Sequence, residues 1–79
     1  MDPTQAFGKA LKRLRVEKGL SQERLAFQAR LHRTHISLLE RGRRQPTLAT
    51  LFRLAAVLGV SAVGFIQAVQ EEIDEAGEG

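Results

Sequence analysis

With 79 residues, the chain can form one small domain with a modest hydrophobic core. It has no cysteine, which excludes a disulfide framework and a thiolate zinc site, and its polar N-terminus lacks the apolar stretch of a signal peptide. The longest apolar run, 54–66, is interrupted by glycine and serine and is shorter than the ~20 residues that cross a bilayer. Residues 1–53 contain twelve basic and four acidic side chains, a net charge of +8, whereas 54–79 contain five acids and no base. A polyanion is the partner that this asymmetry indicates, and a merely soluble basic surface is the alternative.

A first helix is predicted from Pro3 to about Lys18. Asp2 supplies a capping carboxylate, and proline suits the first helical position. Arg15 lies at the edge of the apolar stripe, so it needs an acidic partner if it is partly buried. The residues of that stripe are Phe7, Ala10, Leu11 and Leu14.

Residues 21–42, SQERLAFQARLHRTHISLLERG, are predicted to form two short amphipathic helices joined by a tight turn. Ser21 caps the first of them, and Gly42 ends the second. Apolar residues three and four positions apart give each helix one inward face. These residues are Leu25, Ala26 and Ala29 in the first helix, and Ile36 and Leu39 in the second.

The outward face of the second of these helices is polar. Arginine, threonine and serine side chains can bond base edges or phosphates in the major groove, which is wide enough to admit one helix. Fixed apolar anchors, a small residue where the helices cross and a polar second helix are the layout of a DNA-binding helix-turn-helix. The alternative is an ordinary helical hairpin with a solvated face. The outward residues are Arg33, Thr34 and Ser37, with His35 and Leu38 beside them.

Two more helices are predicted after a charged loop over 42–46, from which Arg43 and Arg44 can reach backbone phosphates. Thr47 caps the fourth helix and Ser61 caps the fifth. The fourth helix ends at Gly59. Its apolar stripe is Leu48, Leu51, Leu54, Ala55 and Leu58, and the fifth helix carries Val63, Phe65, Ile66, Val69 and Ile73.

The fourth and fifth helices have more apolar side chains than one small core requires. An exposed apolar surface near the C-terminus predicts a two-fold dimer through Phe65, Ile66 and Val69. The alternative is a monomer with a wrapped C-terminal helix. We assign 1–70 to a DNA-binding domain and 71–79 to an acidic tail that is expected to fray after about Ile73.

Residues 6–66 resemble the phage-repressor and Cro-type helix-turn-helix regulators, often called the XRE family. The resemblance rests on LKRLRVEKGLSQERLA and ISLLERGRRQPTLATLFRLAAVLGVS. It implies an all-α, lambda-repressor-like fold of five helices, in which the second and third form the DNA-binding unit and the protein usually acts as a dimer. The short chain is also similar to stand-alone controller proteins of restriction–modification systems.

The resemblance implies which side chains contact DNA. Gln22 matches a glutamine that touches phosphate and braces the third helix, and Arg43 and Arg44 lie in a loop that often contacts the backbone. Arg15 and Glu40 match two positions that form a salt bridge in some members, which provides the acidic partner that Arg15 needs. The residues that match base-reading positions are Arg33, Thr34 and Ser37, flanked by His35.

Two positions depart from the family pattern. Arg30 stands in the turn where glycine is common, and a left-handed backbone there costs a non-glycine residue roughly 1 kcal/mol. His32 stands where serine or aspartate usually caps the third helix. This leaves the start of that helix, and the register of the base contacts, open between His32 and Arg33.

We therefore predict a sequence-specific regulator of transcription, a repressor or controller, that binds double-stranded DNA in the major groove as a homodimer on a two-fold operator. The alternative is an antitoxin that uses the same fold to bind its promoter and a toxin. The chain has no glycine-rich phosphate loop or cofactor motif, and His32 and His35 alone make no metal site. We expect no enzyme activity, cofactor, metal, membrane or small-molecule substrate, and a bacterial or phage-encoded protein of the cytoplasm and nucleoid.

Overall fold

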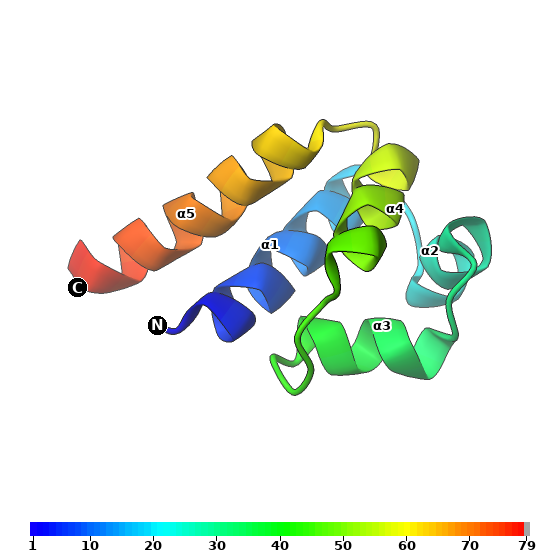
Figure 1. The fold of residues 1–79 in the computed structure, drawn as a ribbon, viewed down its shortest axis with the longest axis horizontal. Coiled ribbons are helices and arrows are strands. Elements are labelled where there is room, and N and C mark those ends of the chain that lie inside the picture. The colour runs from blue at the N-terminus through cyan, green and yellow to red at the C-terminus, as the bar shows by residue number, and fades with distance from the viewer. Residues whose placement is uncertain (79) are drawn as a thin grey trace.

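The computed structural model describes residues 1–78, and it consists of five helices (Figure 1). No strand occurs in this part of the chain, so the all-α fold is confirmed. No single described helix is long and apolar enough to span a bilayer. Only α4 and α5 taken together have sufficient length and apolar composition among the described residues, and they are bent by 99° at their junction. The helices are α1 (Pro3–Glu17), α2 (Gln22–Ala29), α3 (Arg33–Glu40), α4 (Leu48–Leu58) and α5 (Ala62–Glu78).

Side-chain caps explain where four of the helices begin. The Asp2 carboxylate accepts hydrogen bonds from the backbone N–H groups of Thr4 and Gln5, at 2.8 and 3.1 Å. Each cap occupies donors that the first turn of a helix leaves free, and it contributes typically ~1 kcal/mol. The other three predicted caps are also present: Ser21 for α2, Thr47 for α4 and Ser61 for α5.

The turn between α2 and α3 contains the left-handed residue that the sequence analysis considered at Arg30. Arg30 ends α2 in the left-handed region, with φ 59° and ψ 45°. His32 precedes α3 without a side-chain capping bond, and the helix begins at Arg33. Arg33, the first of the predicted base-reading residues, is therefore the first residue of α3.

The core joins all five helices, and α5 packs antiparallel along α1 (Figure 1). Phe65 stacks on Phe7 with a distance of 4.9 Å between ring centroids, and it is fully buried. The prediction that Phe65 and Val69 form a dimer surface was therefore wrong, because both side chains lie on the face of α5 that packs inside the monomer. Leu48, which we placed in the core stripe of α4, is instead 70% exposed.

The C-terminal helix continues beyond the point at which fraying was expected. Ile73 packs against the core, and the Gln70 amide donates to the Asp74 carboxylate at 2.9 Å, one helical turn away. The helix extends to Glu78. Gly79, the last residue of the predicted tail, lies outside the described residues, and the division at residue 70 stays a prediction.

Gly8 allows α1 and α3 to approach closely, and the sequence pattern did not indicate this role. A Cβ atom at Gly8 would lie 2.4 Å from the carbonyl oxygen of Leu39 and 2.7 Å from that of Glu40. The C-terminal end of α3 thus lies directly against the backbone of α1. This contact helps to fix the direction in which α3 leaves the core.

We expect Gly8→Ala to lower the free energy of unfolding by about 1–3 kcal/mol, because the methyl group would displace the end of α3. This loss exceeds the gain of up to about 1 kcal/mol that alanine brings to a helix interior. Urea unfolding followed by circular dichroism measures the change. Gly77→Ala is the matched control, since a Cβ there meets no described neighbour within 4 Å. Equal effects of the two substitutions would contradict the close approach of α1 and α3.

Candidate nucleic-acid interface

The third helix offers one polar face to solvent because its apolar face is buried. Ile36 and Leu39 are both fully buried in the core. Arg33 and Thr34, at the beginning of α3, are exposed, and Ser37 is half-buried. In Figure 1, α3 lies along the lower edge of the molecule, away from α5. Its outer face is thus accessible to a large partner.

A groove on this face gathers several of the predicted contact residues from two helices. Arg41 was missed by the sequence analysis, although it lies four residues after Ser37 and therefore on the same side of α3. The Arg41 Nε donates to the carbonyl oxygen of Ser37 at 3.4 Å. None of the five residues that line the groove is acidic. They are Gln22 from α2, and Arg33, Thr34, Ser37 and Arg41.

His35 does not line this groove and lies in a different electrostatic environment. Partial burial lowers the pKa of its imidazole below the ordinary value of 6.5, and the nearby charges of Arg44, Arg53 and His32 lower that pKa further. Arg53 is an exposed residue of α4 that the sequence analysis also missed. The charged groups that lower the pKa of His35 are thus all basic.

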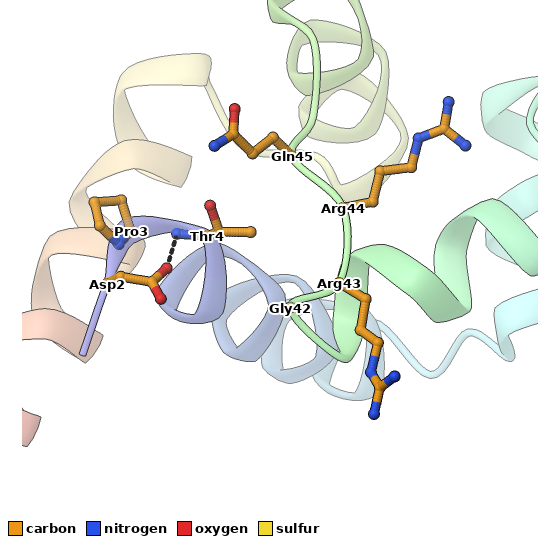
Figure 2. A pocket seen from close by; sticks show the side chains of 7 residues that line it. All are labelled: Asp2, Pro3, Thr4, Gly42, Arg43, Arg44 and Gln45. Carbon is orange, nitrogen blue, oxygen red and sulfur yellow. Dashed lines mark hydrogen bonds between the residues drawn. The ribbon is translucent and has the colours of Figure 1, made fainter.

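The loop between α3 and α4 carries the two arginines that we predicted to contact phosphate. Arg43 and Arg44 are both exposed, and they leave the loop in different directions (Figure 2). They line a shallow depression together with the beginning of α1, where Asp2 already caps the helix. Their divergence suits contacts with two separate phosphates better than joint binding of one anion.

The expected ion pair between Arg15 and Glu40 is present and well buried. Arg15 Nε and Nη2 donate to the two carboxylate oxygens at 2.6 and 3.1 Å, and the two side chains are only 11% and 4% exposed. Arg15 Nη1 also donates to the carbonyl oxygen of Leu20 at 2.8 Å, and the Gln22 amide donates to Glu40 at 3.0 Å. The pair therefore connects α1, the turn before α2, α2 itself and the end of α3.

Within residues 1–78, no group of three or more His, Cys, Asp or Glu side chains is placed to hold an ion.

Comparison with known proteins places this chain in one family. The helix-turn-helix family model matches residues 11–65. An HTH-type transcriptional regulator of Sinorhizobium fredii, y4dJ, is 44% identical over 71 residues, which cover 90% of this chain and 92% of the relative. The control protein C.BamHI of Bacillus amyloliquefaciens is 44% identical over 55 residues, which cover 68% of each chain. The chain belongs to the XRE-type helix-turn-helix family of DNA-binding transcriptional regulators.

Solved structures give the same result for the fold. The restriction–modification controller protein C.Esp1396I matches with a TM-score of 0.84 and 36% identity, over 92% of this chain and 96% of its own. The controller protein C.AhdI from Aeromonas hydrophila matches with a TM-score of 0.76 and 39% identity, over 78% and 94%. Within its family, this chain is thus similar to controller proteins in both sequence and structure.

Loss of the buried ion pair should destabilise the fold. Glu40→Gln leaves the Arg15 guanidinium buried beside a neutral amide, so we expect the free energy of unfolding to fall by about 3 kcal/mol. The control is Glu71→Gln, which breaks a pair with Arg13 that is 3.7 Å long and 38% and 63% exposed. Its effect should stay below about 1 kcal/mol. An unchanged melting temperature for Glu40→Gln would mean that the pair is not structural.

The lowered pKa of His35 predicts a pH-dependent stability. The folded protein binds a proton at His35 less readily than the unfolded chain does. Folding is therefore fully favoured with respect to this group above pH 6.5, and that contribution to the free energy of unfolding is lost as the pH falls through the folded pKa. From about pH 7.5 to about pH 5.5, the free energy of unfolding should fall more in the wild type than in His35→Gln. Urea unfolding at each pH measures the difference. An equal or smaller fall in the wild type would contradict the lowered pKa.

Proposed function

We propose that this protein is a sequence-specific regulator of transcription, a repressor or controller, that binds double-stranded DNA as a homodimer on a two-fold operator. One observation carries the proposal: the groove along α3 combines arginine, threonine and serine with no acid. These side chains complement the acceptors and donors at base edges in the major groove. The buried anchors Ile36 and Leu39 hold that face outward, as a recognition helix requires.

The two kinds of DNA contact fall on different elements. Arg33, Thr34 and Ser37 read base edges, with His35 at the margin of the contact. Arg43 and Arg44 hold phosphates from the loop. Within the described chain, the backbone N–H groups of Gln22 and Glu23 have no hydrogen-bond partner, so the N-terminus of α2 can receive another phosphate. Phosphate contacts supply most of the affinity, and base contacts supply the specificity.

An exposed apolar groove between α4 and α5 supports the dimer. None of the residues that line this groove is charged. This matters for a two-fold contact, in which residues near the axis meet their own copies and like charges would repel. The groove replaces the dimer surface that we expected from the sequence, and only Ile66 belongs to both. Its exposed members are Leu48, Phe52, Val63 and Ile66, between 50% and 70% exposed, with Gln67 and Gln70 beside them.

The division between base-reading residues and phosphate-binding residues can be tested directly. Arg33→Ala should weaken binding to the operator by about 1–3 kcal/mol and relax the preference at one base pair. Arg44→Ala should weaken binding to all sequences alike and reduce the slope of log K against log salt by about 1. Fluorescence anisotropy on operator and random duplexes over a salt series measures both effects. Identical behaviour of the two variants would show that the roles are wrongly assigned.

The dimer surface is tested by a charge in the apolar groove. Ile66→Lys should give a folded monomer, because the half-exposed side chain contributes little to the core but would meet its own copy at the two-fold contact. Sedimentation equilibrium measures the mass. Phe27→Lys is the control, since Phe27 is 77% exposed on α2, outside the groove, and this variant should stay dimeric. A wild-type monomer that instead binds a toxin-like protein through this groove would favour the antitoxin alternative.

A further inference from the structure

The second half of α5 places two carboxylates beside three cations of α1. The cations are spaced three and four residues apart and therefore lie on one side of that helix. The Glu71 carboxylate lies 3.7 Å from the Nη2 atom of Arg13, and Glu72 lines the same shallow depression as all three cations. We refer to these three residues, Lys9, Lys12 and Arg13, as the basic face of α1.

The basic face of α1 is separate from the polar groove of α3. Among the described residues, none lines both that groove and the depression beside the basic face. The depression reaches α3 only at Glu40, the last residue of the helix, whose carboxylate is already held by Arg15. A phosphate bound at the basic face of α1 therefore gains nothing from the side chains that read bases.

Cations outside the reading surface lower the specificity of a DNA-binding protein. Phosphate contacts are made on every sequence, so each additional contact strengthens binding to random DNA. Random sites far outnumber operators in a genome, and the ratio of specific to random affinity decides how much protein reaches its operator. A carboxylate a few ångströms from a cation opposes this attraction, and salt hardly screens it there, because the Debye length is about 10 Å at 0.1 M.

We infer that Glu71 and Glu72 are specificity-determining residues: they neutralise the basic face of α1 and so keep random DNA from binding there. The position of Arg13 agrees with this role. Within the described chain its Nε atom is buried and has no hydrogen-bond partner, and its side chain is only 38% exposed, so the guanidinium is held near α5. The inference rests on the proposed function, in which the side of the molecule with α3 binds DNA.

A general effect of net charge is the competing explanation, because any acid on the protein repels DNA. The two explanations differ in whether the position of the acid matters. Asp74 and Glu75 are exposed acids of the same helix that do not line the depression. Asp74→Asn with Glu75→Gln is therefore the matched control for Glu71→Gln with Glu72→Gln, since both pairs of substitutions remove two negative charges.

The experiment measures binding to a duplex selected by the wild-type protein from a random pool and to a random duplex of equal length, over a salt series. Glu71→Gln with Glu72→Gln should bind the random duplex about tenfold more tightly at about 50 mM salt. The slope of log K against log salt should steepen by about 2, since each new phosphate contact adds about 0.9. Binding to the selected duplex, and binding of the control to either duplex, should change by less than about threefold. The melting temperature of each variant reports whether the fold is intact.

Lys9→Gln with Lys12→Gln completes a double-mutant cycle. In the wild-type background, this lysine pair should change binding to the random duplex by less than about threefold, because the acids already neutralise it. In the background without Glu71 and Glu72, the same change should remove the gain of about tenfold. A net-charge effect predicts equal losses in both backgrounds.

The outcomes separate the inference from the proposed function. Equal effects of the two acid pairs on the random duplex, or equal effects of the lysine pair in both backgrounds, overturn the inference and leave the proposed function standing. A wild-type protein that selects no preferred sequence overturns the proposed function. In that case the comparison on the random duplex still decides whether Glu71 and Glu72 keep DNA from the basic face of α1.

Discussion

The buried ion pair between Arg15 and Glu40 is the interaction on which the rest of the structure depends. Two charges removed from water are tolerated only when their hydrogen-bonding groups are satisfied. Arg15 donates to both Glu40 oxygens and to Leu20, while Glu40 also accepts from Gln22. Together with the close contact at Gly8, these bonds fix the end of α3 relative to α1 and α2. An interaction inside the fold thus determines the geometry of a polar face on its surface.

The polar face of α3 and the apolar groove of α4 and α5 lie on separate elements, so one can bind without distorting the other (Figure 1). In a two-fold dimer, the second surface would set the distance between the two copies of α3. For half-sites in successive major grooves, that distance is about 34 Å. The distribution of charge agrees with this division, since every lysine and arginine precedes residue 54 and the acids of α5 follow it. Within the core, α1 contacts both α3 and α5 and so connects the two surfaces.

The sequence was most informative where structure depends on local spacing. Caps, apolar stripes and the polar face of α3 follow from residues three or four positions apart, and the partner of Arg15 came from the family resemblance. The dimer surface was misplaced because an excess of apolar residues does not say which side of α5 faces α1, so Phe65 was assigned outward. Gly8 was missed because its neighbours in the sequence do not require a glycine. The requirement comes from the backbone of α3, which is distant in the sequence. Arg41 was missed because exposed arginines are common, although its spacing of four residues from Ser37 is local. Arg53 was missed because only the fold brings this residue of α4 near His35.

The most direct test of the central claim, that α3 reads DNA sequence as part of a dimer, is binding of the wild-type protein to the DNA upstream of its own gene. A random duplex of equal length is the reference, and both are measured over a salt series with the mass of the complex recorded. We predict a dimer that protects two half-sites about one helical turn apart and that binds random DNA more weakly, with a steep dependence on salt. Equal, weak binding to both duplexes by a monomer would contradict the claim.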